Sequence, residues 1–228
     1  MKLFTLKKGA LIFIAVLAAF ASLTGGICGK AAEARAAYTP TIVIDAGHGG
    51  VDAGVYGVKT KAKESDINLA IAIYLKGYFA DAGFNAVMTR KTQAGLYGLP
   101  VRGFKKRDMQ KRRQIIEDCD ADMVISIHQN SASQRSRRGS QIYYNPDNLA
   151  GKSLAENIKN SIDCMNELVR EADVLAGDYY MLECTSNPSV IVECGFLTNA
   201  EDDQLLNTEE YRKSIAYAIF RGAIAYLA

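Results

Sequence analysis

The chain has 228 residues, which is enough for one domain with its own hydrophobic core. With 49% hydrophobic and 23% charged residues it has the composition of a globular protein, which excludes an intrinsically disordered chain. The net charge is +2, but residues 1–37 carry five basic residues and one acidic residue. The remaining chain therefore has 22 basic and 24 acidic residues, a net charge of −2, and no global charge that would favour nucleic-acid binding.

The first 37 residues contain, in sequence, the basic, apolar and small polar regions that are typical of a secretory signal peptide. Three lysines, Lys2, Lys7 and Lys8, precede an apolar run from Ala10 to Leu23, and small and polar residues follow it. The run is shorter than the roughly 18–20 residues of a comfortable membrane span, which favours a signal peptide over its alternative, an uncleaved N-terminal membrane anchor. We therefore predict an exported protein, secreted or membrane-anchored, whose only membrane contact is through residues 1–37 and whose folded domain is residues 38–228.

Hydrophobic periodicity predicts alternating strands and helices in that domain. Apolar or alternating runs predict strands at residues 41–45, 84–89, 123–128, 139–144, 179–182 and 189–194. Apolar residues at three- and four-residue spacing predict helices at residues 66–81, 107–118, 151–171 and 208–227. Ser65 or Asp66 can cap the first helix and Thr208 the last. The alternation predicts a single α/β domain with a mostly parallel sheet and helices on both faces.

Three of the predicted strands end in a residue that can bind metal or transfer protons. His48 follows the strand at 41–45 in a glycine-rich loop, His128 ends the strand at 123–128, and Glu193 lies in the last strand. Neighbouring parallel strands end at one edge of a sheet, so these groups can converge. A catalytic zinc commonly has two histidines and a carboxylate as ligands. Glu64 is a candidate third ligand, on a loop just before the first helix.

Each of these residues also has a structural explanation, and spacing alone does not choose between the two. The histidines can be ordinary hydrogen-bonded groups, and Glu64 can be a helix-start carboxylate. Glu193 is harder to explain structurally, because an unpaired carboxylate in an apolar strand costs several kcal/mol. Asp45 either orients a histidine or only ends its strand. Arg107 and Asn130 either shape a substrate groove or have ordinary helix-surface and turn roles.

The sequence lacks the motifs of several other kinds of functional site. The sequence has no G-x-S-x-G nucleophile elbow, and its five cysteines form no C-x-x-C pair. The glycines around His48 match neither G-x-G-x-x-G nor a phosphate-binding loop. Covalent acyl transfer, a cysteine-based zinc module and nucleotide binding are therefore not supported.

Four ordered segments resemble the zinc-dependent N-acetylmuramoyl-L-alanine amidases of the family-3 type. They are IVIDAGHGGVDAGVYG, KESDINLAIAI, ADMVISIHQNSA and SVIVECGFLTNAED, and the resemblance runs from about Thr41 to the C-terminus. It implies the family fold, a twisted sheet of about six strands. It also implies that His48, Glu64 and His128 hold Zn²⁺ and that Glu193 is the catalytic carboxylate. The usual proline of the first segment is Ala46 here, a conservative departure.

The resemblance further implies a peptidoglycan hydrolase. Its substrate would be the amide between the lactyl group of N-acetylmuramic acid and L-alanine, with zinc activating a water molecule and Glu193 as general base. The GDYYML segment looks most like germination-type members that act on spore cortex. An inactive wall-binding protein and a zinc carboxypeptidase acting on the stem peptide are the alternatives. The requirement for an activating protein partner stays open.

Overall fold

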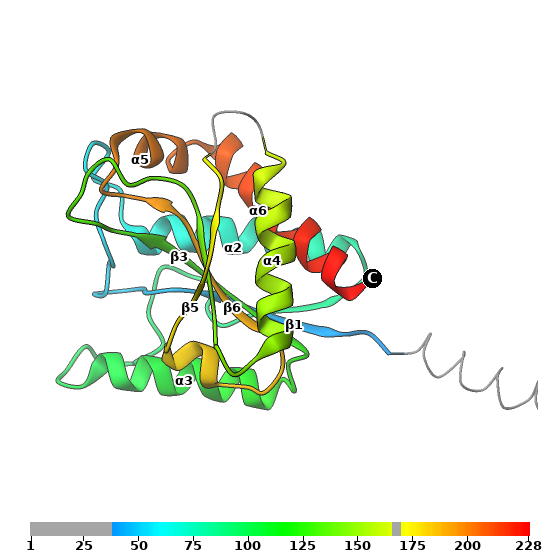
Figure 1. The fold of residues 1–228 in the computed structure, drawn as a ribbon. Helices are drawn as coiled ribbons and strands as arrows, with labels where there is room; N and C mark the ends of the chain where they lie inside the picture. The colour runs from blue at the N-terminus through cyan, green and yellow to red at the C-terminus, as the bar shows by residue number, and fades with distance from the viewer. Residues whose placement is uncertain (1–37, 166–169) are drawn as a thin grey trace, which may run out of the picture. The chain divides into compact units, whose positions relative to one another are not determined.

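The computed structural model describes residues 38–165 and 170–228 (Figure 1). The predicted signal peptide or anchor at residues 1–37 lies outside these described residues. Pro40–Ala228 form one compact unit. None of the helices within the described ranges combines the length and the hydropathy that crossing a membrane requires.

The described part of the chain alternates strands with helices, as predicted. The strands are β1 (Thr41–Ala46), β2 (Asn85–Met88), β3 (Met123–Asn130), β4 (Gln141–Tyr144), β5 (Asp173–Ala176) and β6 (Ser189–Phe196). The α-helices are α2 (Glu64–Asp81), α3 (Phe104–Asp118), α4 (Leu149–Asp163), α5 (Ala200–Leu206) and α6 (Glu209–Leu227), and a 3₁₀ turn, η1, spans Tyr180–Glu183.

The six strands form one sheet in the order β2-β1-β3-β6-β4-β5. All neighbouring pairs are parallel except β4 and β6, which are antiparallel. Helices α2, α4 and α6 cover one face, and α3 with η1 lies against the other (Figure 1). The predicted fold class, a single α/β domain with a mostly parallel six-stranded sheet, is therefore confirmed.

The central strand β3 shows why the sheet needs cover on both faces. Met123, Ile125 and Ile127 belong to the hydrophobic core on the side of α2, α4 and α6, whereas Val124 belongs to the smaller core on the side of α3. All four side chains are fully buried. Continuous apolar runs of this kind are typical of parallel strands buried on both faces.

Several local predictions were wrong. Residues 179–182 do not form a strand, since Tyr180–Glu183 is a 3₁₀ turn that buries the adjacent Met181 and Leu182. The helix predicted at 151–171 ends at Asp163, and the short elements β5 and α5 were missed. Both are too short to show a clear period. The predicted Thr208 cap is confirmed, because its hydroxyl accepts a hydrogen bond from the Tyr211 amide.

Candidate active site

The loop after β1 carries His48 back over the carboxyl edge of the sheet. β1 and β3 are parallel, and the Gly47 amide continues their pairing by donating to the Ile127 carbonyl at 3.1 Å. His48 has a φ of 60°, a left-handed conformation that few non-glycine residues adopt. The buried Arg112 holds this loop by donating to the His48 carbonyl at 2.7 Å. Backbone strain held by its surroundings is common at functional sites.

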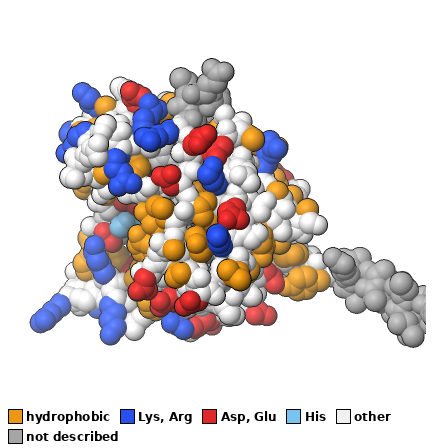
Figure 2. All heavy atoms as spheres, in the orientation of Figure 1, with side chains coloured by type: hydrophobic (Ala, Val, Ile, Leu, Met, Phe, Trp, Pro, Cys, Tyr) orange, Lys and Arg blue, Asp and Glu red, His pale blue; other side chains and the backbone are white. Residues whose placement is uncertain are grey.

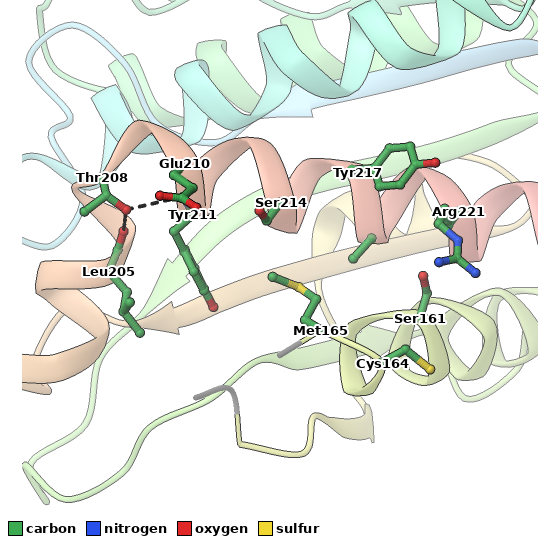
Figure 3. A pocket seen from close by; sticks show the side chains of 11 residues that line it. Ser161, Cys164, Met165, Leu205, Thr208, Glu210, Tyr211, Ser214, Tyr217 and Arg221 are labelled. Atoms are coloured by element: carbon green, nitrogen blue, oxygen red, sulfur yellow. Dashed lines mark hydrogen bonds between the residues drawn. The ribbon is translucent and has the colours of Figure 1, made fainter. Parts of the chain in front are cut away.

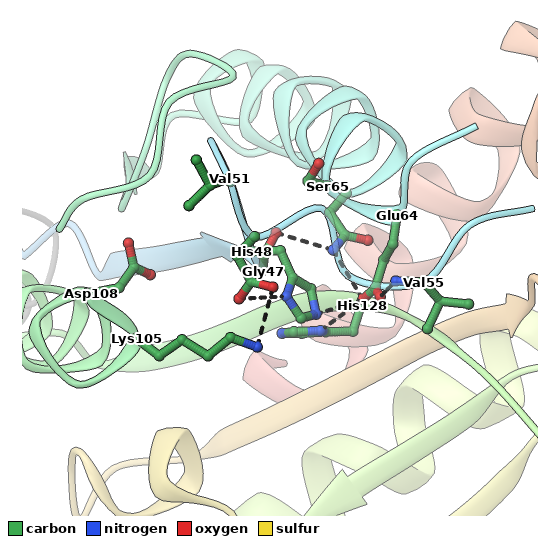
Figure 4. Close-up of polar contacts among 12 residues, drawn as sticks. Gly47, His48, Val51, Val55, Glu64, Ser65, Lys105, Asp108 and His128 are labelled. Atoms are coloured by element: carbon green, nitrogen blue, oxygen red, sulfur yellow. Dashed lines mark hydrogen bonds and ion pairs between the residues drawn. The ribbon is translucent and has the colours of Figure 1, made fainter. Parts of the chain in front are cut away.

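Three potential metal ligands meet at this edge (Figure 4). One ligand atom from each of His48, Glu64 and His128 lies within 4.8 Å of the others. The Oε1 atom of Glu64 is 3.2 Å from Nε2 of His48 and 3.0 Å from Nδ1 of His128. Two imidazoles and one carboxylate converging in this way could hold a metal ion, and they match the donor set that catalytic zinc sites commonly use.

Glu64 lies in the first turn of α2 and not on the preceding loop, because the helix begins two residues earlier than predicted. The predicted cap by Ser65 or Asp66 is wrong, since Lys63 occupies the N-cap position without a side-chain hydrogen bond. The backbone amides of Val55 and Gln129 donate to the Glu64 carboxylate at 2.9 and 3.1 Å.

The surroundings of Glu64 favour its ionised form. Burial opposes ionisation, but hydrogen bonds and charge from His128 and His48 outweigh it and hold the pKa of Glu64 well below its usual range. For His48, burial opposes protonation, and Glu64 together with Asp52 outweighs it, so that the pKa of His48 is raised. The site therefore presents a fixed negative charge between two imidazoles, which favours a bound cation.

Asp52, and not Asp45, orients a histidine. Oδ2 of Asp52 lies 3.1 Å from Nδ1 of His48, on the side of the ring away from Glu64. Lys105 approaches the same carboxylate at 3.3 Å. Asp45 is instead buried and accepts from Arg112 at 2.5 Å and from Ser126 at 2.6 Å. The sequence did not predict this role of Asp52. Asp52 is only four residues after His48, but no local pattern shows that the chain turns between them and brings the two side chains into contact.

Two glycines leave room for the side chains of His128 and Glu64, because any larger residue at these positions would overlap them. A Cβ atom on Gly47 would overlap the imidazole ring of His128, and one on Gly54 would overlap the Glu64 carboxylate. Gly54 also has a φ of 68°, which disfavours any side chain. The glycine-rich composition of this loop is therefore a packing requirement of the site.

Glu193 lies beside the three potential ligands. It is the strand partner of His128, so both side chains project from the same face of the sheet. Burial raises the pKa of Glu193 to about 7. Its Oε2 atom is buried and has no hydrogen-bond partner within residues 38–165 and 170–228. A carboxylate with such a free oxygen and a raised pKa is suited to exchanging protons with a bound reactant.

Of the two residues considered for a substrate groove, Asn130 lies on the same strand as His128. Its amide donates to the Gln141 side chain at 2.8 Å, on the strand next to Glu193. Arg107 fastens the loop before α3, since its guanidinium donates to the carbonyls of Tyr97, Leu99, Val101 and Arg102. Arg107 therefore has a structural role.

A cavity of about 490 Å³ lies elsewhere in the domain. It is lined by residues of α4 and α6 and of the segments next to them, including Ser161, Met165, Tyr211 and Arg221 (Figure 3). None of its lining residues belongs to the histidine and glutamate cluster. We place the active site at the cluster, because convergent donor atoms define a reaction centre better than cavity size does.

The chain matches a known protein family. Residues 42–225 match the family model Amidase_3, described as N-acetylmuramoyl-L-alanine amidase. The germination-specific N-acetylmuramoyl-L-alanine amidase of Bacillus subtilis is 29% identical over 189 residues, which cover 81% of this chain and 78% of that protein.

Solved structures agree with this match. The CwlD amidase of Clostridioides difficile, solved in complex with the GerS lipoprotein, has a TM-score of 0.76 and 34% identity, covering 83% of this chain and 98% of that chain. The amidase AmiC2 of Nostoc punctiforme has a TM-score of 0.71 and 32% identity, covering 82% and 97%. The resemblance seen in the four sequence segments is therefore confirmed.

Proposed function

Because the chain belongs to the Amidase_3 family of N-acetylmuramoyl-L-alanine amidases, we propose that it hydrolyses the amide between the lactyl group of N-acetylmuramic acid and L-alanine of the peptidoglycan stem peptide. The single observation that carries the proposal is the convergence of His48, Glu64 and His128 beside Glu193, the strand partner of His128. Hydrolysis of an unactivated amide requires a polarised carbonyl and an activated water, and these groups are suited to supply both.

Zinc is the ion that we assign to the three-residue cluster. Two histidines and one carboxylate leave a fourth position for water or substrate, as in other zinc hydrolases. The Oε2 atom of Glu193 lies on the strand next to His128 and has no hydrogen-bond partner among the described residues, so it can accept a hydrogen bond from a water in the fourth position. A bound zinc would supply a Lewis acid and a water of low pKa, near ~7.

The side chains of the chain then have separate tasks. His48, Glu64 and His128 would hold the ion. Glu193 accepts the proton of the attacking water and passes it to the departing L-alanine nitrogen. Asp52 holds the ring of His48 through Nδ1, and Nε2 faces Glu64.

We further propose spore cortex peptidoglycan as the substrate and a protein partner as a regulator. The first follows the germination-specific relative of B. subtilis, and the second follows the CwlD amidase, which was solved with a lipoprotein. Both require an exported protein, in agreement with the leader expected at residues 1–37. Digests of cortex and vegetative wall, with and without a co-purifying protein, test this assignment.

The test of the central proposal is product analysis. The purified protein is expected to contain about one zinc per chain and to release intact stem peptides with a free L-alanine amino terminus, as seen by mass spectrometry. A chelator should abolish release, and added zinc should restore it. Peptides shortened at their carboxyl end would instead identify a carboxypeptidase. Binding to wall without any product would identify an inactive wall-binding protein.

Removing the carboxylate behind His48 should weaken zinc binding. Asp52→Ala is expected to lower zinc affinity about 10- to 100-fold, because the His48 ring loses the partner that fixes its orientation. Competition titration with a chromogenic chelator measures this change. Asp81→Ala, which removes an exposed carboxylate at the end of α2, is the matched control and should keep the parent affinity. Equal affinities in both variants would show that Asp52 does not orient the ligand.

A further inference from the structure

A row of polar side chains crosses four neighbouring strands, starting at the metal cluster. His128 of β3 is the strand partner of Glu193 in β6, which is the partner of Gln141 in β4, which is the partner of Asp173 in β5. Residues directly opposite each other project from the same face of a sheet. Because strands lie about 4.8 Å apart, Gln141 is roughly 10 Å from His128.

The far end of this row opens into a second cavity, which we call the arginine pocket. Its volume is about 340 Å³. The residues that characterise it are Arg137, Arg138, Gln141, Arg170, Asp173 and Phe196. Three arginines face one aspartate, so the pocket is positively charged in a domain whose own net charge is negative. Figure 2 shows one face of the domain, on which Lys and Arg side chains lie above and below a partly exposed histidine.

The three arginines are not equivalent. Arg138 forms ion pairs with Glu201 and Asp202, which use its charge within the fold. The guanidinium of Arg137 stands over the Phe196 ring, 5.3 Å from its centroid. Within residues 38–165 and 170–228, no carboxylate or carbonyl accepts a hydrogen bond from the side chain of Arg137 or Arg170. Stacking on Phe196 therefore positions the Arg137 guanidinium while its N–H groups stay available.

The polar groups on the floor of the pocket are already satisfied. The Gln141 side chain accepts hydrogen bonds from Asn130 at 2.8 Å and Tyr143 at 3.2 Å, and it donates to Asp173 at 3.2 Å. The pocket is also lined by the neutral Gln134 and Ser136, so its available charged groups are arginine N–H groups, which are donors only. They fit an anion that accepts a fork of hydrogen bonds.

We propose that the arginine pocket binds the free carboxylate of the acidic residue that follows L-alanine in the stem peptide. This proposal rests on the amidase function proposed above. That carboxylate is five bonds beyond the L-alanine nitrogen, a span of roughly 6–7 Å. With the scissile amide at the metal cluster, this span and the roughly 3 Å of a charge-assisted hydrogen bond together reach about 10 Å along the polar row, the distance at which Gln141 lines the arginine pocket. Arg137 is then a specificity-determining residue, since a guanidinium fork matches a carboxylate in charge and geometry.

The experiment compares two muramyl peptides that differ in one group, a free carboxylate or a carboxamide on the residue after L-alanine. The parent protein is expected to prefer the carboxylate by about tenfold in kcat/KM, the size of one charge-assisted hydrogen-bond pair at a partly exposed site. Arg137→Gln should lose this preference by slowing only the carboxylate substrate. Arg137→Lys, which keeps the charge but not the fork, should retain part of it.

Arg113→Gln is the control, because Arg113 is an exposed arginine of α3 that pairs with Glu117 outside the pocket. It should keep the parent preference within about twofold. An Arg137→Gln variant with the parent preference, or one that slows both substrates equally, would overturn the carboxylate site while leaving the amidase function standing. If the parent cleaved the lactyl–L-alanine amide of neither substrate, the amidase function itself would fail.

Discussion

Replacing Glu193 by glutamine is expected to lower kcat by about 10²- to 10⁴-fold, the usual contribution of a positioned general base. Glutamine has nearly the same shape but cannot accept the proton of the attacking water. The carboxylate is not one of the three atoms of the metal cluster, so the variant should still bind one zinc per chain. Steady-state hydrolysis of a muramyl peptide and metal analysis of the same sample measure both properties.

A second readout separates catalysis from folding. The buried Glu193 oxygen has no partner, and burial raises the pKa of the group to about 7, so the fold gains nothing from its charge. The free energy of unfolding of metal-free Glu193→Gln should therefore stay within about 1 kcal/mol of the parent value. The exposed Glu183→Gln is the control for activity. Parent turnover in Glu193→Gln would remove Glu193 from the mechanism.

Replacing Arg112 by methionine is expected to lower the free energy of unfolding by about 3–5 kcal/mol, because it leaves buried charges without a partner. Arg112 is 1% exposed and donates to Asp45 at 2.5 Å and to Asp108 at 2.6 Å. It also donates to the carbonyls of Ala46 and His48, so its loss loosens the histidine loop. Urea unfolding of the metal-free protein measures the change.

Arg113→Met is the matched control in the same helix. Arg113 is exposed and forms a salt bridge with the exposed Glu117, so the change should stay within about 0.5 kcal/mol. A loss below 1 kcal/mol in Arg112→Met would show that the buried network does not stabilise the fold.

The pH dependence of stability gives a separate test of this network. Burial opposes ionisation of Asp45, but Arg112, with hydrogen bonds from Ser126 and Thr89, lowers its pKa from 3.8 to about 2. A folded-state pKa below the unfolded value means that Asp45 stabilises the parent above pH 4, and that this contribution is lost as the pH falls towards 2. In Arg112→Met burial is no longer outweighed by the guanidinium, so the pKa of Asp45 should rise above its unfolded value. The Asp45 contribution should then vanish between pH 2 and pH 4, and stability should fall as the pH rises above 4.

Local sequence patterns were sufficient to predict the strands and helices in which hydrophobic residues repeat regularly over many positions. β1, β3, β6, α2 and α6 were each predicted to within a few residues, because their apolar residues repeat over many positions. The elements that were missed or misassigned, β5, α5 and η1, are four to seven residues long. A single turn or edge strand takes its conformation from its neighbours, and its own sequence has too few residues to show a period.

The sequence by itself determined which groups could perform the chemistry. His48, His128 and Glu193 stand out because polar groups at the ends of apolar parallel strands must share one edge of the sheet. The four segments then pointed to Glu64 through the resemblance to a family. Only the tertiary structure decided how these groups are held: Asp52 behind His48, Arg112 beneath the loop, Gly47 against the His128 ring, and the arginine pocket in line with Glu193. These contacts join residues that are far apart in the sequence or lie on opposite sides of a turn. Their distances depend on strand register and close packing in the folded chain, and local sequence patterns do not show them.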